Sequence, residues 1–232
     1  MSLSEMFDRM EIAHFPARIL RKWREVGPLY ALQMIYWEIF PNWLFDVNAW
    51  VVLATDIREH AANRSHDPAI RWATETDIDA LAACGVDRRK VQQAFKGDVR
   101  IALLERDGRV LVHGWYGSNM HEQDDWLTFR LKPGDLMGAR IWVRPDCRGQ
   151  GLAPRVIGFV WSEMARAGRV RSVGIINVLN RNSRRAIAKN GSTVAGRLFY
   201  IRFLGLTYIR YGALKKIGFW NPRNRLDLTL AD

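Results

Sequence analysis

Glycines at positions 149 and 151 stand in the part of the chain that is best suited to binding an anion. They belong to the run Arg148–Ala153 (Arg-Gly-Gln-Gly-Leu-Ala), which follows a predicted strand and enters a predicted helix. Glycine lets successive backbone amides converge on a ligand without a side chain in the way. The first amides of a helix have no partner within it and carry positive potential, to which Arg148 adds its charge. The run therefore predicts a site for a phosphate or pyrophosphate group.

A plain glycine-rich turn between a strand and a helix is the alternative interpretation, because such turns are common. The run lacks the Lys-Ser/Thr pair of a Walker A loop. It also lacks the third glycine of a dinucleotide-binding fingerprint, which would follow the opening strand of its unit instead of standing this late. The spacing of the glycines thus points away from both nucleotide-binding motifs.

The turn needs a strand before it and a helix after it, and the hydrophobic pattern predicts both. Residues 136–143 read as a strand that stops at Arg144-Pro145, and residues 153–167 as an amphipathic helix that ends at Gly168. The pattern then predicts a buried strand at 171–178, a short helix at 183–189, strands at 194–203 and 207–211, and a mostly irregular tail at 221–232.

Strands and helices also alternate before the turn. Thr74 and Asp77 have the spacing of a capping box, and Asp107-Gly108 predicts a tight hairpin. The predicted elements are strands at 69–74, 99–105, 109–116 and 124–131, with helices at 75–83 and 87–95. Such alternation is typical of α/β or α+β folds, so we expect one such domain over residues 69–232.

Residues 1–68 are aromatic and partly basic, and end in a polar stretch at 60–68 that reads as a linker. Residues 16–26 are predicted to form a basic amphipathic helix, and residues 49–57 a strand. We predict an extension that packs its apolar face on the main domain; a helix lying on a membrane surface is the alternative. Polar residues and Pro41 interrupt the apolar stretch 29–54, so it is not expected to cross a bilayer.

The composition sets the class of protein and of partner. The chain has 232 residues, enough for one core and too few for two ordinary catalytic domains. Hydrophobic residues make up 48% and charged residues 25%, as in folded soluble proteins. The net charge of +11 attracts anions, among them CoA, acidic carrier proteins and anionic lipids. There is no arginine-rich tail or nucleic-acid motif, which argues against nucleic acid as a partner.

Cysteine usage and the first residues bear on the compartment. Cys84 and Cys147 are the only cysteines, so we predict neither a disulfide framework nor a metal site. The first twenty residues mix acids and bases and contain no apolar core of a signal peptide. A cytoplasmic protein is the simplest expectation, with peripheral membrane contact through the N-terminal segment under the alternative above.

Two runs of residues together resemble one known family. The stretch Val143–Ala153 resembles the acyl-CoA-binding motif R/Q-x-x-G-x-G/A of GNAT acyltransferases, with Arg148, Gly151 and Ala153 in its fixed places. Asn180 to Ser183, followed by Lys189-Asn190-Gly191, is similar to the family's N-x-x-S/A segment and its closing K-x-G-F. The resemblance covers roughly residues 69–211. It implies the GNAT fold, a mixed, mostly antiparallel central sheet flanked by helices.

The resemblance also implies a co-substrate, acetyl-CoA or another acyl-CoA. In GNAT enzymes the strand before the turn splays from its neighbour and offers backbone groups to the pantetheine arm, while the turn holds the pyrophosphate. The implied cofactor-binding residues are Ile141, Trp142, Val143, Arg148, Gly149, Gln150, Gly151, Leu152, Ala153, Asn180 and Ser183. N-capping of the short helix is the alternative role for Asn180 and Ser183.

The implied reaction is the attack of a neutral amine on a thioester, which needs close approach and a group that takes the amine proton. Many family members carry a tyrosine acid where this chain has Ile187, and an aromatic residue where it has Ser192. Many also carry a glutamate base on the splayed strand, but residues 136–143 contain no carboxylate.

The proton acceptor is therefore sought elsewhere. His113 has an ordinary pKa near the working range and is our candidate base; a surface or satisfied strand histidine is the alternative. Glu122, Asp124 and Asp125, in the loop expected after that strand, are further candidates, for proton transfer or for holding a cationic acceptor.

We accordingly predict an N-acyltransferase that moves an acetyl or other acyl group from acyl-CoA to a primary amine of a small molecule. The layout is similar to acyltransferases of surface-polysaccharide or lipid pathways, which would make the acceptor an amino sugar or an amino acid. One alternative is an N-acyl amino acid synthase that takes its acyl chain from an acidic acyl carrier protein. Another is a non-catalytic binding protein on the GNAT scaffold, because a fold does not set a function.

Overall fold

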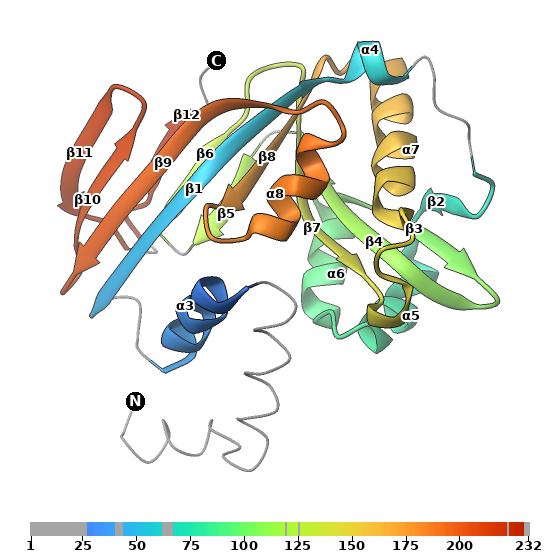
Figure 1. Ribbon diagram of the computed structural model, residues 1–232, viewed down its shortest axis with the longest axis horizontal. Coiled ribbons are helices and arrows are strands. Elements are labelled where there is room, and N and C mark those ends of the chain that lie inside the picture. Colours follow the sequence, from blue (N-terminus) through green and yellow to red (C-terminus); the bar gives the residue numbers. More distant parts are fainter. Residues whose placement is uncertain are drawn as a thin grey trace.

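The computed structural model describes residues 27–39, 44–61, 67–118, 120–124, 126–221 and 223–229. The helix predicted at 16–26 and most of the linker predicted at 60–68 lie outside these residues. The described chain folds around a nine-stranded sheet of order β11-β10-β9-β1-β8-β7-β4-β3-β2, with a second sheet of order β12-β6-β5 beside it (Figure 1).

The strands of the main sheet are β1 (Phe45–Asp56), β2 (Ile70–Trp72), β3 (Arg100–Arg106), β4 (Arg109–Gly117), β7 (Asp135–Val143), β8 (Arg171–Asn177), β9 (Thr193–Phe203), β10 (Leu206–Tyr211) and β11 (Leu214–Phe219). Those of the second sheet are β5 (Met120–Asp124), β6 (Leu127–Arg130) and β12 (Leu226–Thr229). The helices are α3 (Pro28–Ile39), α4 (Ile57–Ala61), α5 (Ile78–Ala83), α6 (Arg88–Lys96), α7 (Leu152–Arg166) and α8 (Arg181–Ala188), with short 3-10 turns at Glu75–Asp77 and Pro145–Cys147.

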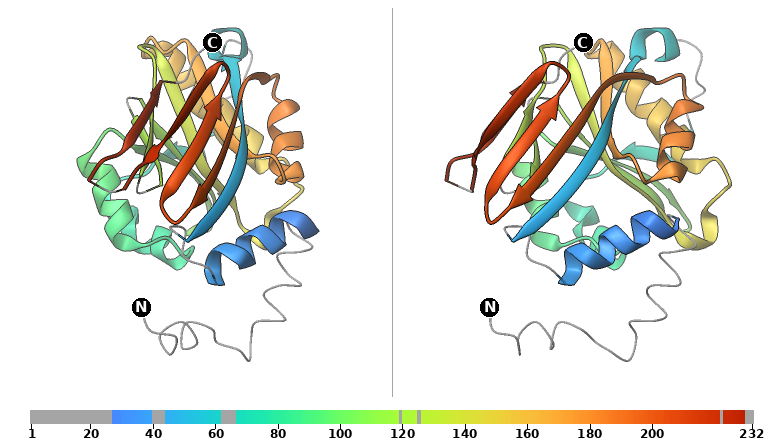
Figure 2. Two further views of the ribbon diagram at one scale, coloured as in Figure 1. Left: turned by 90° about the vertical axis from the view of Figure 1, so that its left-hand side faces the viewer. Right: turned by 60° about the vertical axis from the view of Figure 1, so that its left-hand side comes forward.

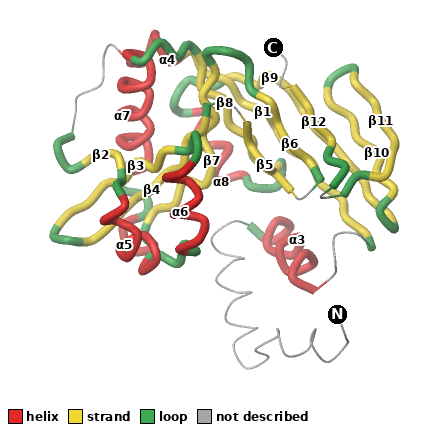
Figure 3. The backbone as a smooth tube through the Cα atoms, turned by 180° about the vertical axis from the view of Figure 1, so that it is seen from behind, coloured by secondary structure: helices red, strands yellow, loops and turns green. Residues whose placement is uncertain are grey.

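The architecture confirms the expected fold class, a mostly antiparallel mixed sheet flanked by helices. Within the main sheet, β7 and β8 are parallel, and the other described pairs are antiparallel. Helix α7 packs on one face through a core that includes Val156, Val160 and Leu136. Helices α5 and α6 pack on the opposite face, as Figure 3 shows from behind. The second sheet shares that opposite face and buries Trp126 and Phe129 there.

The strand predicted at 49–57 is present as β1, but its place corrects the expected domain boundary. β1 lies between β8 and β9 and pairs with both, from Trp50↔Asn177 on one side to Phe45↔Phe203 on the other. Its apolar run is buried on both faces, Trp50 and Val52 toward the second sheet and Val51 toward α8. A continuous apolar run is typical of such a central strand. Residues 45–56 are therefore part of the main sheet, and no extension of separate structure ends at residue 68.

Three further strands differ from the sequence prediction. Glu122 and Asp124, which were expected in a loop after β4, belong to the strand β5, which pairs with β6. The tail expected to be irregular contains β12, which runs parallel to β6 and buries Leu226 and Leu228. β11, which was not predicted, adds an antiparallel edge to β10. Four-residue strands such as β12 form only against a distant partner, so their own pattern is too short to reveal them.

Most of the other predicted elements are confirmed within a few residues. The capping box predicted at Thr74 and Asp77 is present, because the Asp77 carboxylate accepts a hydrogen bond of 2.8 Å from the amide of Thr74. Asp107 and Gly108 both have positive φ, as their hairpin requires. None of the described helices has the length and apolar character needed to cross a membrane; α3, in the apolar stretch near the N-terminus, has 12 residues.

Candidate functional site

β7 and β8 separate part of the way along their length. They pair from Asp135↔Arg171 to Gly138↔Gly174. Both strands then continue in the described structure, to Val143 and Asn177, without further pairing to each other. Glycines at the point of separation leave the apex of the opening free of side chains. The splay that the resemblance implied at the end of β7 is therefore present as a wedge between two parallel strands.

A bulge in β7 accompanies the opening. The register between β4 and β7 shifts between His113 and Trp115, and Arg140, opposite this shift, has a φ of 52°. A positive φ is uncommon for a residue with a side chain, and bulges of this kind redirect a strand near functional sites. Beyond the bulge, Ile141 packs toward α7. The strand stays paired to β4 on one side only, so alternate backbone groups face the wedge.

The glycine-rich turn joins β7 to α7 at the wide end of the wedge. Gly149 and Gly151 have φ values of 79° and 71°, and Gly151 is the N-cap of α7. Among the described residues, no acceptor bonds the amides from Gly149 to Ala153. A Cβ built on either glycine would meet no described atom within 4 Å. The turn therefore presents bare amides to open space at a helix N-terminus, the arrangement that binds phosphate groups.

The charged side chains at the turn are held close to it. Arg148 donates from Nε to the carbonyl oxygen of Val143 at 3.3 Å, so its guanidinium lies at the junction of strand and turn. Arg144 is paired with Asp146 at 2.8 Å. Gln150 reaches back to the carbonyl oxygen of Asp146 at 3.5 Å. The positive potential at the turn thus comes from the helix terminus together with Arg148.

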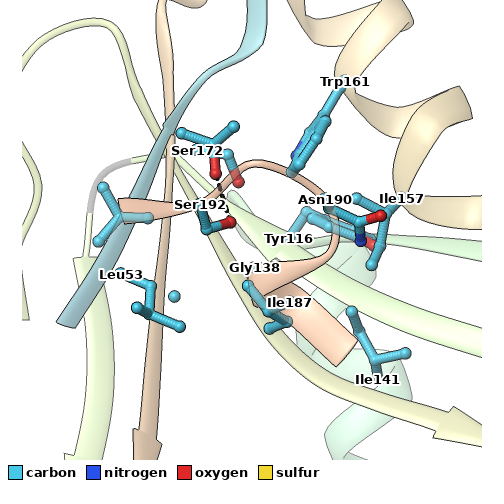
Figure 4. Close-up of a pocket in the computed structure, with 13 residues that line it drawn as sticks. Leu53, Tyr116, Gly138, Ile141, Ile157, Trp161, Ser172, Ile187, Asn190 and Ser192 are labelled. Carbon is cyan, nitrogen blue, oxygen red and sulfur yellow. Dashed lines mark hydrogen bonds between the residues drawn. The ribbon is translucent and has the colours of Figure 1, made fainter. Parts of the chain in front are cut away.

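A pocket occupies the wedge (Figure 4). It lies under α7 and α8 and takes side chains or backbone from strands on both sides of the opening. Its lining residues are Leu53, Thr55, Tyr116, Gly138, Ile141, Ile157, Trp161, Ser172, Val173, Gly174, Ile187, Asn190 and Ser192. The wedge and the turn are adjacent, because Ile157 belongs to the second turn of the helix that the glycines begin. The turn and the pocket thus lie at successive positions along α7, in line for an elongated ligand with an anionic end.

Tyr116 supplies a polar group that the sequence analysis missed. Its ring lies against Gly114 and Gly138, since a Cβ at Gly114 would stand 2.9 Å from the Tyr116 oxygen. The hydroxyl is buried and has no hydrogen-bond partner among the described residues. Burial raises the pKa of Tyr116, so the hydroxyl stays protonated and can donate. Glycines at 114 and 138 were the only signal, and it can be read only once β4 and β7 are known to be neighbours.

His113 does not lie in the pocket. It is 4% exposed and stacks on Trp142, with ring centroids 5.3 Å apart and planes 12° apart. Neither ring nitrogen has a partner among the described residues, and burial lowers its pKa to about 4. Its side chain lies on the face opposite the pocket, because Val112 and Gly114, its neighbours along β4, face α7. The prediction that His113 is the base is therefore corrected, because its ring is not placed to take a proton from a ligand in the wedge.

The remaining predicted residues are distributed as follows. Asn180 is the N-cap of α8 and accepts a hydrogen bond from the amide of Ser183 at 3.1 Å, which is the alternative role. Neither residue is among those that line the pocket. Ile187 and Ser192, the two departures from the family pattern, both line it, and Ser192 is 2.6 Å from the Thr55 hydroxyl. The backbone of Glu122 and Asp124 is in β5, and Asp125 lies outside the described residues.

Comparisons with known proteins rest on structure. No protein-family model matches the sequence, and a search of curated proteins finds no significant match. Among solved structures, a protein from Novosphingobium aromaticivorans assigned to the GNAT acetyltransferases matches with a TM-score of 0.51 and 18% identity, over 66% of this chain and 63% of that one. A conserved protein of unknown function from Staphylococcus epidermidis matches with a TM-score of 0.49 and 10% identity, over 74% and 66%. The chain therefore spans less than two thirds of the length of either neighbour.

Proposed function

We propose that the chain, which has the fold of the GNAT acetyltransferases, is an N-acyltransferase that uses an acyl-CoA thioester as donor and a primary amine as acceptor. The observation that carries the proposal is the junction of β7 and α7. There, bare amides from Gly149 to Ala153 stand beside a wedge where β7 and β8 no longer pair. A diphosphate with a long, mostly apolar arm has the shape and charge that this junction accepts.

The donor is held mainly by backbone. The diphosphate accepts hydrogen bonds from the amides of the turn, and Arg148 adds charge from the side of Val143. The pantetheine amides pair with the groups that β7 leaves open from Ile141 to Val143, as an added strand would. The thioester then reaches the pocket between Gly138 and Ile187.

In the reaction, the amine nitrogen attacks the thioester carbonyl carbon, the C–S bond breaks, and CoA leaves as a thiolate. The amine gives up a proton to water or solvent base, and the thiolate gains one, so the products are an amide and CoA thiol. Tyr116 is the buried donor that we assign to the thioester oxygen or sulfur. Ile187 offers no proton, so we expect slower turnover than in enzymes with an acid at that position.

A specific feature favours a second candidate, a non-catalytic protein that binds an acyl-CoA. The pocket has an isoleucine where many family members have a tyrosine acid, and the candidate base His113 faces away from it. Such a protein would bind CoA through the same turn and would release no thiol.

The test combines binding and turnover. CoA and acetyl-CoA binding is measured by calorimetry, and thiol release is followed with a panel of amino sugars, amino acids and polyamines. Binding together with thiol release in the presence of one amine class supports the transferase. Binding without release across the panel supports the second candidate. Release only from a long acyl carrier protein thioester would move the donor from CoA to a carrier, and failure to bind any CoA thioester would refute both candidates.

A further inference from the structure

The outer half of the main sheet carries apolar side chains on a face that the described elements leave largely uncovered; at its edge, Tyr36 of α3 makes an edge-to-face contact with Phe45. On the inner half of this face, α7 and α8 pack over β7, β8 and the adjoining part of β1 (Figure 1). Beyond α8, the strands β9, β10 and β11 continue the same face (Figure 2). Val51 under α8 and Arg197 on β9 are direct cross-strand partners, which shows that the two halves share one face.

Cross-strand pairing arranges the outer residues in rows. The first row is Phe45, Phe203, Leu206 and Phe219, the second is Val47, Ile201, Tyr208 and Ile217, and the third is Ala49, Phe199, Arg210 and Lys215. Phe203, Ile217 and Phe219 are 60%, 70% and 63% exposed. We call these twelve residues, together with Arg197, the outer face. Contiguous exposed apolar surface of this kind marks an interaction site.

The polar groups on the outer face point to an anionic partner. Apart from Tyr208, its polar members are the cations Arg197, Arg210 and Lys215. Fourteen of the 35 Lys and Arg lie between Glu163 and Asp227, whereas none of the 24 Asp and Glu does. This segment forms β8, α8, β9, β10 and β11. The excess positive charge of the chain is thus concentrated in the elements that form the outer face and its border with α8.

We propose that the outer face docks on an anionic lipid surface, with Phe, Ile and Leu side chains in the interfacial region and Arg and Lys on the headgroups. Aromatic and aliphatic side chains next to cations are the combination that interfacial binding requires. A second copy of the chain would bring like charges together, which opposes association. An acidic protein would satisfy the cations but would leave rows of apolar side chains against polar surface.

The test is co-sedimentation of the full chain with vesicles of neutral phosphatidylcholine and with vesicles containing phosphatidylglycerol. We expect binding to the anionic vesicles, weaker binding at high salt because the charges are screened, and little binding to neutral ones. The variant Phe203→Ser/Ile217→Ser should lose about tenfold or more in partitioning, since it removes exposed apolar area. In the variant Arg210→Gln/Lys215→Gln, the partition coefficient onto anionic vesicles should fall about fivefold for each charge removed.

Two matched variants act as controls. Leu29→Ser/Leu32→Ser removes apolar side chains that are 59% and 50% exposed on α3, and Lys96→Gln/Arg109→Gln removes two exposed cations from α6 and β4. Both should bind vesicles as the parent does. Loss of binding in the α3 variant, with the outer-face variant unaffected, would move the contact to the N-terminal side and overturn the proposal. If the unmodified protein does not bind anionic vesicles but self-associates, and Phe203→Ser/Ile217→Ser abolishes this association, the proposal is wrong. The outer face would then bind a second copy of the chain.

Discussion

The inner and outer halves of one sheet face offer different groups for binding: the inner half offers mainly backbone groups, and the outer half offers side chains. In the inner half, β7 and β8 stop pairing, a helix begins at two glycines, and backbone amides and a buried hydroxyl remain available. In the outer half, β1, β9, β10 and β11 pair with one another through the rows from Phe45↔Phe203 to Leu206↔Phe219, and side chains form the surface. A backbone cradle suits a small anion of defined shape, whereas rows of side chains suit a broad, non-specific surface. Both face the same side of the molecule, so a ligand and a surface can be engaged together.

The largest effect is expected at the turn. Gly151→Val should weaken CoA binding by about 1000-fold, roughly 4 kcal/mol, because a β-branched residue does not tolerate the φ of 71° and two or more charge-assisted hydrogen bonds are lost. Calorimetry with CoA measures this. Gly168→Val, with a φ of 82° at the other end of α7, imposes similar strain and should destabilise the fold without changing CoA affinity. Equal affinities in the two variants would refute the assignment of the turn.

Substitution of His113 tests whether the sheet face opposite the pocket takes part in the reaction. Burial lowers its folded pKa to about 4, so between pH 6.5 and 4 the unfolded chain binds more protons than the folded one. Stability should therefore fall by up to about 3 kcal/mol as the pH falls through this window. His113→Phe keeps the stacking on Trp142 and should flatten the slope in denaturant titrations at several pH values. Turnover should survive; loss of turnover in a folded variant would restore the histidine as base.

Tyr116 should matter for turnover and not for folding. Tyr116→Phe removes one hydrogen bond to the thioester and should lower kcat about tenfold. Stability should hold or rise slightly, because the lost hydroxyl has no described partner. Tyr208→Phe on the outer face is the matched change and should leave kcat unaltered. If kcat for the two variants is the same, the hydroxyl of Tyr116 does not touch the reacting atoms.

The smallest effect is expected where the outer face is trimmed. Ile217→Ala should change the free energy of unfolding by less than about 0.5 kcal/mol, since Ile217 is 70% exposed. Ile57→Ala, at a fully buried position under α7, should cost about 2–5 kcal/mol. Urea titrations compare the two. A large cost at Ile217 would mean that the outer face is covered in solution and is not a free docking surface.

Much of the inner half could be predicted from sequence, because its signals are local. The positive φ of Gly149 and Gly151 could be predicted from a few neighbouring residues, and so could the hairpin at Asp107-Gly108. The splay at the end of β7 came from the family resemblance and is present in the structure. In the outer half, the strands β1, β9 and β10 were predicted, but β11 and the row pattern were not, because they depend on which strands pair and no local signal carries that.

The sequence by itself determined the turn, the helix that follows it and the concentration of positive charge near the C-terminus, since these depend on residue types and short spacings. Tertiary structure alone decided that β1 inserts between β8 and β9, that Tyr116 reaches the pocket while His113 is buried on the other face, and that Phe203, Ile217 and Phe219 are left exposed by the described residues. Backbone preferences act over a few residues, whereas burial and strand pairing depend on segments more than a hundred residues apart, such as those joined at Phe45↔Phe203.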